Sequence, residues 1–312
     1  MPLHNESSVA IIILNWNGYE HSRNCLDSLA KLTYSNFQVL LVDNASVDGS
    51  GTRLKEEFPS VIFLQNEQNL GFTGGNNVGI TYALEHGFSY VMLLNNDTLV
   101  APDFLKHMVD MLANDASIGI VQPLILWMED PEKIWSAGGE FQPWLGISKT
   151  KGDRAALESY RFSSQALDWV TGCCMLVPSK VIQELGPLQA SFFAYFEDVD
   201  WSLRIRKAGY QLLLSNESII YHEGNASSKK ASKEGTLSPT VFYLHARNQL
   251  FLIRRHLFFP AILLAFGYHL IKYSAWIMYF CFRGRFKKAK AVIKGMKDGL
   301  LLDHHVNRPL CP

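Results

Sequence analysis

Apolar and polar positions alternate in blocks along the N-terminal third of the chain. Apolar runs occupy residues 9–14, 37–42, 61–64 and 90–94, and Gln38 is the one polar residue within them. Their length and continuity are typical of strands buried on both faces of a parallel sheet. Helical spacing lies between them at 19–32 and 48–58, and a glycine-rich loop at 71–77 opens a helix to about residue 85. The alternation predicts an α/β fold: a mostly parallel sheet with helices on both faces.

The pattern is less regular after the fourth run. A helix is predicted from Pro102 to about residue 114, a strand at 118–126 and a β-rich stretch at 168–178. Ser179 is predicted to cap a short helix. A further helix begins at the acidic residues 197–200 and ends before Gly209, and a strand follows at 211–221. We expect loops or a hairpin at 127–166, where no clean period is present.

The composition changes near residue 241. Residues 257–282 are strongly apolar but contain Pro260, His269 and Lys272, and a basic segment follows at 283–297. The apolar stretch has the ~20 residues that a bilayer span requires. Its interruptions favour an interfacial helix pair on a membrane surface, anchored by Trp276 and the basic segment. A packed helical subdomain or an oligomer contact is the remaining alternative. We therefore separate residues 1–240 from an apolar C-terminal helical appendage, a membrane-associating region at 241–312.

Charge and cysteine content narrow the function classes. Lys and Arg together number 29, as do Asp and Glu, so no net charge attracts the chain to nucleic acid. The five cysteines lack metal-ligand spacing and are typical of free thiols in a reducing compartment. The first eight residues lack the basic and apolar segments of a secretory signal. We expect a protein at the cytoplasmic face of the cell membrane, peripheral or weakly anchored through its C-terminal region.

Polar residues follow the predicted strands, at the edge of the sheet where α/β proteins bind ligands. Asn95, Asn96 and Asp97 come directly after the fourth apolar run. A carboxylate at that place can hold a hard divalent cation beside a diphosphate. The competing interpretation is that Asp97 caps the turn that follows it.

The segment after the second apolar run contains Asp43, Ser46 and Asp48. Asp43 is placed to accept a hydrogen bond from the N3–H of uracil or thymine, a donor that cytosine lacks. Ser46 and Asp48 are better explained as caps of the next helix. The glycines at 71–77 allow a ribose or phosphate to approach the backbone, although an ordinary glycine turn fits the same spacing.

Three acids, Glu197, Asp198 and Asp200, lie within four residues at the start of a predicted helix. Like charges at this spacing cost stability, and a helix N-terminus offsets only part of that cost. An Asp in this place can take the proton of an attacking hydroxyl, and the neighbouring aromatic residues, Trp201 among them, suit a sugar ring. A merely charged first turn is the alternative. His222, after the last predicted strand, is either a metal contact or a structural histidine.

Seven motifs together resemble the family 2 glycosyltransferases, and within them the bacterial rhamnosyltransferase-like branch. They are VAIIILNWNG, VDNASVDGS, NLGFTGGNN, LLNNDT, TGCCMLVPS, FFAYFEDVDWSLRIRKAGY and YHEG, in this order over about residues 8–255. The resemblance implies a GT-A fold, a Mg²⁺ or Mn²⁺ cofactor and inversion by one in-line displacement. We assign a donor half to about residues 8–126 and an acceptor and catalytic half to 127–240.

The resemblance also implies roles for individual residues. Asp198 matches the catalytic base, and Glu197 would orient the acceptor. Asp97 matches a metal-binding aspartate and His222 a further metal contact, with Asn95 in place of the first acid of the metal motif. The nucleotide contacts are assigned to Asn15, Asn17, Asp43, Gly74, Asn77 and Asn96. The loop beside the sugar and acceptor is assigned to Gly172, Cys173 and Trp201.

The predicted reaction transfers a sugar from a dTDP- or UDP-linked donor, with dTDP-rhamnose favoured, to a hydroxyl of a glycan or lipid-linked acceptor. A nucleotidyltransferase would need a basic glycine-rich loop after the first strand, and a nicotinamide dehydrogenase would need GxGxxG there. Residues 15–18 are instead Asn-Trp-Asn-Gly. A non-enzymatic, membrane-associated nucleotide-binding protein would leave Asp43, Asp97 and Asp198 unexplained.

Overall fold

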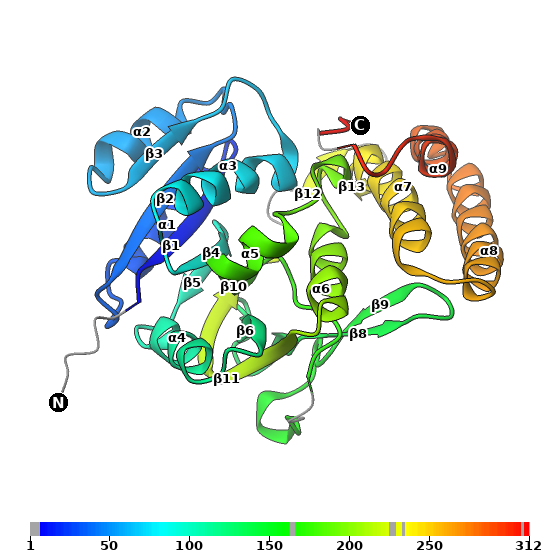
Figure 1. Ribbon diagram of the computed structural model, residues 1–312. Coiled ribbons are helices and arrows are strands. Elements are labelled where there is room, and N and C mark those ends of the chain that lie inside the picture. Colours follow the sequence, from blue (N-terminus) through cyan, green and yellow to red (C-terminus); the bar gives the residue numbers. More distant parts are fainter. Residues whose placement is uncertain (1–6, 163–165, 225–228, 233–234, 307–308, 312) are drawn as a thin grey trace.

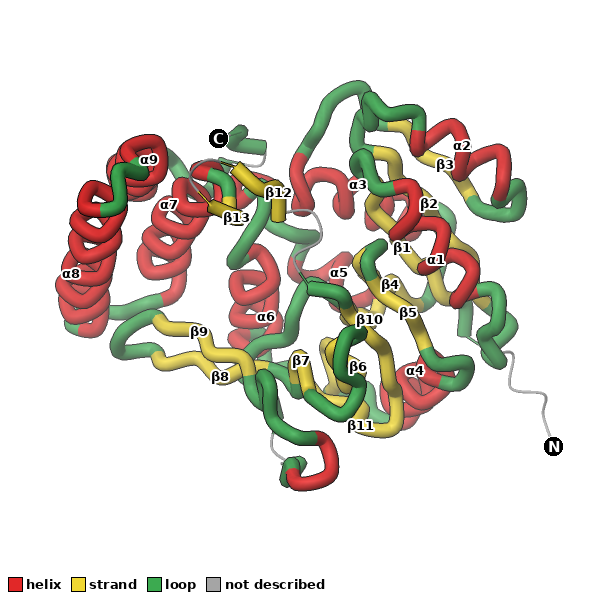
Figure 2. The backbone as a smooth tube through the Cα atoms, turned by 180° about the vertical axis from the view of Figure 1, so that it is seen from behind, coloured by secondary structure: helices red, strands yellow, loops and turns green. Residues whose placement is uncertain are grey.

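The computed structural model describes residues 7–162, 166–224, 229–232, 235–306 and 309–311. Within these residues a nine-stranded sheet forms the centre of the molecule, and helices cover both of its faces (Figure 1, Figure 2). The strand order is β3-β2-β1-β4-β10-β6-β11-β5, and β7 pairs with β6. The β3-β2-β1-β4 half is parallel throughout, whereas β10, β5 and β7 run antiparallel to their neighbours.

The strands of this sheet are β1 (Val9–Asn15), β2 (Phe37–Asp43), β3 (Ile62–Gln65), β4 (Tyr90–Asn95), β5 (Thr98–Val100), β6 (Ile118–Trp127), β7 (Ile134–Ser136), β10 (Cys174–Pro178) and β11 (Gln211–His222). Two hairpins lie outside it: β8 (Gly139–Gln142) with β9 (Ile147–Thr150), and β12 (Lys229–Ser232) with β13 (Gly235–Leu237). The first of them lies in the region where loops or a hairpin are expected.

The helices are α1 (Tyr19–Leu29), α2 (Ser50–Glu57), α3 (Gly71–Glu85), α4 (Phe104–Asn114), α5 (Ser179–Leu185), α6 (Glu197–Lys207), α7 (Pro239–His256), α8 (Ala261–Phe282) and α9 (Phe286–Leu301). The side chains of β1 explain the two layers. Ile11 and Ile13 pack with α1, α2 and α4, whereas Ala10 and Ile12 pack with α3, α5 and α6. Because both faces are buried, the strand is apolar from Val9 to Leu14.

The glycine-rich segment predicted as a loop is instead the beginning of α3. A Cβ on Gly75 would lie 2.4 Å from Leu14 Cδ1, and a Cβ on Gly79 would lie 2.8 Å from Ile12 Cγ2. These glycines therefore let α3 pack closely against β1. The pattern that suggested a ligand loop reflects close packing of helix on strand.

Ser179 does not cap α5 as predicted. Its hydroxyl donates to the Phe88 carbonyl at 2.5 Å, and the residue at the N-cap is Pro178, which forms no side-chain cap. Ser179 therefore ties the start of α5 to the turn before β4 rather than satisfying the free N–H groups of its own helix.

One edge of the sheet collects the ends of several strands. β1 and β2 are parallel and in register, so Asn15 lies beside Asp43 where both strands end. β10 is antiparallel to β4 and therefore begins at this edge, where Asn95 donates its N–H to the Cys173 carbonyl. β11 ends there with His222. The topology thus gathers segments that are far apart in the sequence.

The three C-terminal helices lie on the opposite side of the molecule from β1, β2 and β3 (Figure 1). α7 packs against α6 and α9, and α8 reaches the tip of the β8–β9 hairpin, where His269 Nε2 lies 3.0 Å from the Leu145 carbonyl. Gln249 of α7 donates to the Gly146 carbonyl of the same tip. The C-terminal region therefore packs against the rest of the chain along α6 and the hairpin.

Candidate active site

A cavity of about 1080 Å³ opens at the edge of the sheet where β1 and β4 end. Its walls come from the loops after β1, β2 and β4, from the segment before α6, and from α7 and α8. Eight of the predicted site residues belong to its lining: Asn17, Asn96, Asp97, Gly172, Cys173, Glu197, Asp198 and His222. Asp97 and Asp198, on which the catalytic hypothesis depends, therefore share one cavity.

Asp97 and His222 form a buried pair in this lining. The pairing of β5 with β11 sets His222 opposite Thr98, the residue after Asp97. His222 Nε2 lies 3.1 Å from Asp97 Oδ1, and both side chains are almost fully buried. Burial raises the pKa of Asp97, but the hydrogen bond and charge of His222 outweigh it, so that pKa is lower than usual. Asp97 is thereby held as a carboxylate.

A carboxylate oxygen and an imidazole nitrogen are ligand types that divalent cations accept. Among the described residues, no group of three His, Cys, Asp or Glu side chains is placed to hold a metal. A cation held by Asp97 and His222 would therefore take further ligands from a bound anion and from water. Trp135 packs edge-on against the His222 ring, with 4.4 Å between ring centroids, and restricts its orientation. These two side chains fit a cation that is bound together with a phosphate group.

Glu197 and Asp198 stand at the N-terminus of α6. Asp198 Oδ2 accepts the Gly172 N–H at 2.9 Å, and its Oδ1 accepts the Val199 N–H at 2.8 Å. Burial raises the pKa of Asp198, and the backbone donors offset only part of this effect. Burial also raises the pKa of Glu197 well above its usual range, and the neighbouring Asp198 adds to the shift. A carboxylate with a raised pKa and a fixed orientation is suited to taking a proton from a hydroxyl.

The segment that leads into α6 has an unusual backbone. Phe193, Tyr195 and Phe196 have φ angles of 67°, 70° and 70°, in the left-handed region that such bulky residues rarely adopt. Asn248 of α7 holds this segment, because its amide donates to the carbonyls of Phe192, Ala194 and Tyr195. The guanidinium group of Arg247, also on α7, donates two further hydrogen bonds to backbone carbonyls at the start of this segment. Strained backbone persists only where its surroundings fix it, so α7 is part of the site.

Asp43 lies beneath the cavity and outside its described lining. It is 1% exposed, and its oxygens accept hydrogen bonds from the Asn15 and Gln65 side chains and from both the hydroxyl and the N–H of Ser46. A carboxylate has about four lone-pair sites, so Asp43 keeps none for a pyrimidine N3–H. In this structure Asp43 positions the loop that follows it, and its predicted contact with the base stays a prediction.

Asn15 has a similar supporting role. Its side chain is fully buried, and its amide donates to Asp43, Ser46 and Ser50. Its amide group already has protein partners in this structure, and the predicted nucleotide contact of Asn15 stays a prediction. The residue fastens the end of β1 to the loop after β2.

Asn17 and Asn96 do reach the cavity. Asn17 donates its N–H to Ser46 Oγ, and its side-chain oxygen accepts the Val47 N–H. Asn96 donates to Ser22 Oγ at 2.8 Å. The loops after β1 and β2 thus hold each other at the rim, and polar side chains remain beside the space that a nucleotide would occupy.

Gly74, Asn77 and Trp201 lie outside the described cavity lining. A Cβ on Gly74 would lie 2.7 Å from the Leu70 Cβ. The Asn77 amide exchanges two hydrogen bonds with the backbone of Leu188. Trp201 is fully buried, and its indole N–H donates to a backbone carbonyl at 3.0 Å. Each of these residues serves the packing of α3 or α6 in this structure, and their predicted nucleotide and sugar contacts stay predictions.

Cys173 borders the cavity without being a nucleophile. Burial raises the pKa of its thiol well above the usual range, and the nearby Asp97 carboxylate adds to this shift. A thiol that stays protonated is a weak nucleophile. The Gly172–Cys173 loop acts instead through its backbone, which joins β10 to β4 and orients Asp198.

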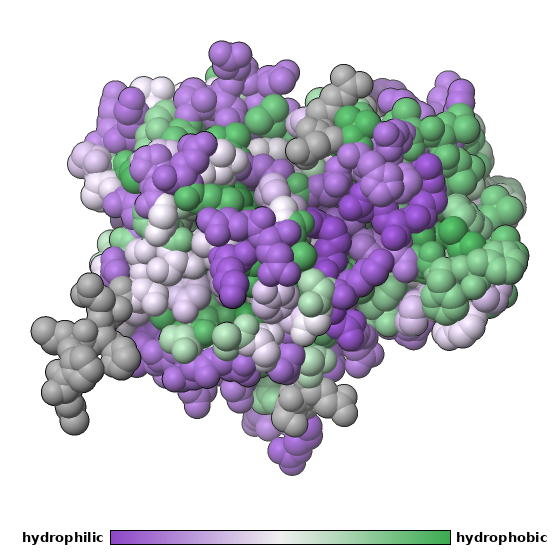
Figure 3. Space-filling view, viewed as in Figure 1, coloured by the Kyte–Doolittle hydropathy of each residue, from purple (hydrophilic) through white to green (hydrophobic). Residues whose placement is uncertain are grey.

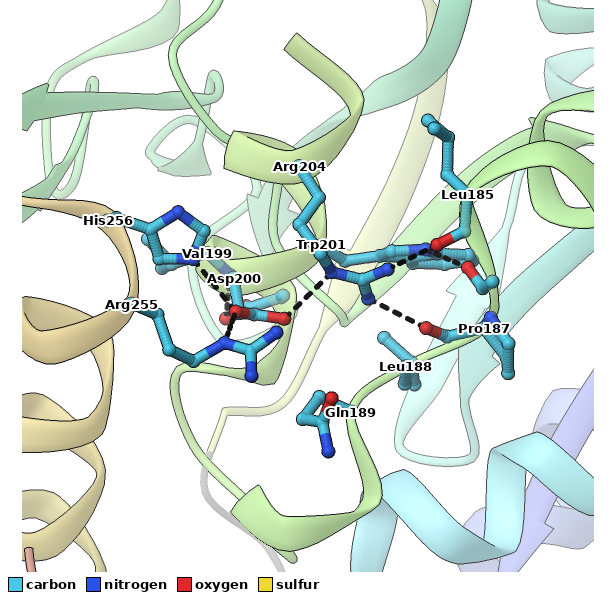
Figure 4. A network of polar contacts seen from close by, with 12 residues as sticks. Leu185, Pro187, Leu188, Gln189, Val199, Asp200, Trp201, Arg204, Arg255 and His256 are labelled. Atoms are coloured by element: carbon cyan, nitrogen blue, oxygen red, sulfur yellow. Dashed lines mark hydrogen bonds and ion pairs between the residues drawn. The ribbon is translucent and has the colours of Figure 1, made fainter. Parts of the chain in front are cut away.

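Asp200, the third acid, lies in a buried cluster rather than in the cavity lining (Figure 4). Its oxygens lie 3.0 Å from Arg204, 2.7 Å from Arg255 and 2.8 Å from His256. Burial opposes ionisation, but the His256 hydrogen bond and the two arginine charges together lower the pKa of Asp200 to about 2. Because Arg255 and His256 belong to α7, the cluster ties α6, and with it the acids at its N-terminus, to α7.

The sequence did not reveal that α7 and α8 line the cavity. His245 and Gln249 of α7, and Tyr268, His269 and Lys272 of α8, belong to its lining. The three α8 residues are spaced to share one helix face. Polar residues at helical spacing inside an apolar stretch are the signal in the sequence that could have indicated this inward face.

The architecture corresponds to a known class of fold. The structure is similar to the crystal structure of GalNAc-T7 with UDP, GalNAc and Mn²⁺, with a TM-score of 0.63 at 18% sequence identity. The likeness covers 80% of this chain and 48% of that one. The mixed sheet with helices on both faces is the GT-A fold, which confirms the predicted fold class.

The sequence profile described as "Glycosyl transferase family 2" matches residues 10–178. The low-salt glycan biosynthesis hexosyltransferase Agl10 of Haloferax volcanii is 26% identical over 200 residues, which are 64% of this chain and 62% of that protein. The N-acetylglucosaminyl-diphospho-decaprenol L-rhamnosyltransferase of Mycobacterium tuberculosis is 23% identical over 267 residues, 79% of this chain and 84% of that protein. The chain belongs to glycosyltransferase family 2 and is a glycosyltransferase, as predicted.

The matched lengths differ between these proteins. This chain spans less than two thirds of the archaeal relative and about half of GalNAc-T7. The similarity therefore covers only part of those two proteins, but most of the mycobacterial relative.

Proposed function

We propose that this glycosyltransferase moves a sugar from a nucleoside diphosphate to an acceptor hydroxyl with inversion, and that Asp198 is the base. The observation that carries the proposal is the single cavity shared by Asp97, on the nucleotide side, and Asp198, at the N-terminus of α6. One carboxylate is held ionised by a histidine, and the other has a pKa raised by burial. The ionised carboxylate of Asp97 is suited to hold a cation, and the raised pKa of Asp198 suits it to accept a proton.

Asp97 and His222 are the residues proposed to hold Mg²⁺ or Mn²⁺. When bound, such a cation neutralises the charge that grows on the departing diphosphate. GalNAc-T7, whose fold this chain shares, has a structure with UDP and Mn²⁺. The nucleoside would lie against the rim residues Asn17 and Asn96, since Asp43 beneath them has no free acceptor.

Asp198 is proposed to take the proton of the acceptor hydroxyl. The Gly172 and Val199 N–H groups fix its carboxylate and leave one lone pair on each oxygen. Glu197 Oε2 is buried and forms no hydrogen bond in the described structure. We assign Glu197 to a second acceptor hydroxyl, whose hydrogen bond would satisfy this buried atom.

Nucleotide binding tests this function. Thermal unfolding with Mn²⁺ is expected to show stabilisation by UDP or dTDP, worth ~2.7 kcal/mol at ~100 times Kd, and none by ATP. EDTA and Asp97→Ala are each expected to remove the metal-dependent part, because both remove the link between cation and diphosphate. Asp110→Ala, in an exposed ion pair with Lys106, is the control. Stabilisation by ATP alone would favour a nucleotidyltransferase, and full metal-dependent UDP binding by Asp97→Ala would refute the cation role.

The donor and acceptor are proposed from the relatives. The mycobacterial relative is named as a rhamnosyltransferase that acts on N-acetylglucosaminyl-diphospho-decaprenol. We propose dTDP-rhamnose as the donor, with UDP-hexoses next, and a lipid-linked or polysaccharide glycan as the acceptor. A donor screen that measures release of the nucleoside diphosphate discriminates among these sugars.

We also propose that α8 and α9 lie against the cytoplasmic face of a membrane. α8 is, among the described helices, the one long and apolar enough to cross a bilayer, and most of it is exposed. Apolar surface gathers over both helices (Figure 3). Its exposed members on α8 are Leu263, Leu264, Leu270, Ile271, Met278, Tyr279 and Phe282. Because the opposite face of α8 packs on the protein and lines the cavity, an interfacial position is favoured over a span.

The predicted anchor Trp276 does not belong to this surface. Its ring packs against Phe242 at 5.6 Å and against Tyr273 at 5.5 Å between ring centroids, so it faces α7. Exposed basic residues of the α8–α9 turn and of α9 complete the surface instead: Arg283, Lys287, Lys290, Lys294 and Lys297. They suit an anionic lipid surface.

Vesicle sedimentation checks the membrane surface. The protein is expected to bind vesicles that contain phosphatidylglycerol, and to bind more weakly at high salt. Ile271→Glu with Phe282→Glu should weaken binding at least ~10-fold, because these side chains, 73% and 89% exposed, lose their burial in lipid. Val47→Glu changes an equally exposed apolar residue far from α8 and should have no effect. A wild-type protein that remains in the supernatant at low salt would contradict the proposal.

A further inference from the structure

Lys272 has an unusual place in the cavity. Among the described lining residues it is the one Lys or Arg side chain. No acidic group in the described structure lies within ion-pair distance of it, and its ammonium group is 5.3 Å from the Trp276 ring and 5.4 Å from the Tyr273 ring. The side chain is partly buried. The rings offset part of the cost of this partly buried charge, and an anion in the space next to Lys272 would offset the rest.

The neighbours of Lys272 do not supply that anion. His245 and His269 line the same part of the cavity, and burial, together with the Lys272 charge, lowers the pKa of each to about 4. Both rings are therefore neutral near neutral pH. The α8 end of the cavity thus presents one positive charge among neutral polar groups, whereas the other end carries the carboxylates of Asp97 and Asp198.

The position of Lys272 separates it from the donor diphosphate. Asp97 and His222 lie where β4 and β11 end, whereas Lys272 lies on α8, beyond α7 (Figure 1). The outer face of α8 is the exposed apolar surface described above. A ligand that extends from Asp198 along the cavity toward α8 therefore meets a base, then a cation, and then an apolar surface.

We propose that Lys272 forms a subsite for a phosphate group attached to the acceptor sugar, so that the acceptor is an amphiphilic sugar phosphate whose apolar chain leaves along α8. This inference rests on the proposed function and deepens it. Lys272 binds the phosphate as a point charge, and the neutral side chains beside it, His245, Gln249 and Tyr268, line the path of the sugar.

Kinetics with two acceptors test the subsite in the full chain. One probe is N-acetylglucosaminyl-diphospho-decanol, and the other is decyl N-acetylglucosaminide, which has the same sugar and chain but no phosphate. Lys272→Gln is expected to raise KM for the first about 10- to 100-fold, the loss of one charge-assisted hydrogen bond, with little change in kcat or in KM for the second. Lys272→Arg should retain most of the affinity, and Lys180→Gln, at an exposed position of α5, is the control. Equal effects on both acceptors, or none on either, would overturn the subsite.

A binding measurement keeps the inference testable whatever sugar the enzyme prefers. Calorimetry in EDTA, which keeps cations out of the Asp97 region, compares decyl phosphate, decyl glucoside and inorganic phosphate. The wild type should bind decyl phosphate at least ~10-fold more tightly than decyl glucoside, and Lys272→Gln should lose this difference. Inorganic phosphate should bind weakly, because it lacks the chain that lies along α8. No preference for decyl phosphate in the wild type would refute the subsite, and intact UDP stabilisation of the same protein would leave the proposed function standing.

Discussion

Asp198→Asn is expected to lower kcat for sugar transfer by ~10²–10⁴-fold, the loss typical for a positioned general base. Asn has nearly the shape of Asp and keeps an acceptor for the Gly172 N–H, but it cannot take a proton. Nucleotide binding should be unchanged, because Asp97 and His222, the residues proposed to hold the cation, contact each other and not Asp198. Transfer rates, together with calorimetry of UDP and Mn²⁺, measure the two effects independently.

A control exists for the lost carboxylate. Asp115 is exposed and also accepts a backbone N–H, from Ser117 at 2.8 Å, so Asp115→Asn imposes the same chemical change far from the cavity. Its kcat should equal that of the wild type. An Asp198→Asn enzyme with unchanged kcat would show that another group takes the proton.

The pH dependence of kcat is a second test of Asp198 as the proposed base. Burial raises the pKa of Asp198, and it raises that of Glu197 further. A base must be deprotonated, so kcat is expected to fall as pH decreases through the raised value, above the range of an ordinary Asp. The fall of kcat at low pH reports the joint titration of Asp198 and Glu197 rather than that of either residue alone. A flat kcat between about pH 4 and pH 8 would contradict a carboxylate base with a raised pKa.

Asp200→Ala is expected to lower the free energy of unfolding by ~3–5 kcal/mol, because it removes the anion of a buried ion cluster. Arg204, Arg255 and His256 would then face one another without it. Urea unfolding measures the loss. Asp110→Ala breaks an exposed pair with Lys106 and should cost less than ~1 kcal/mol.

The same cluster gives stability a pH dependence. The pKa of Asp200 is depressed to about 2 in the folded chain, whereas it is ~3.9 in an unfolded one. Its contribution is therefore fully present above ~3.9 and is lost as pH falls through about 2. Asp200→Ala should lack this part of the acid dependence. Stability equal to that of the Asp110→Ala control would show that the cluster contributes little to the fold.

The pattern of apolar residues within short segments was sufficient to predict the α/β fold of this protein. The apolar run of β1 is buried on both faces, so its period is visible without knowledge of its neighbours. Asp97 and Asp198, which line one cavity, were singled out by local signals. Asp97 follows the end of a strand, and Asp198 lies in an acidic first helical turn. The motif order then gave the family, which the sequence profile confirms.

Residues that mimic a ligand-binding pattern were harder to assign. Asp43 follows a strand just as Asp97 does, but four protein hydrogen bonds occupy its oxygens. The glycines of α3 resemble a phosphate loop, but Gly75 and Gly79 accommodate β1. Sequence spacing records which groups are present and not which of them already have partners, so these roles depended on contacts across the fold.

The sequence by itself therefore determined the α/β framework, the family and the two carboxylates at element ends, because periodicity and capping act within a few residues. The tertiary structure alone decided which acid faces the cavity and which is neutralised. Asp200 differs from Asp198 because its partners Arg255 and His256 lie more than fifty residues away, on α7. It also turned Lys272 inward, toward the cavity, while other residues of α8, Ile271 and Phe282 among them, are exposed. The burial and the charge partners of such a side chain come from residues distant in sequence, so they are decided only when the chain is folded.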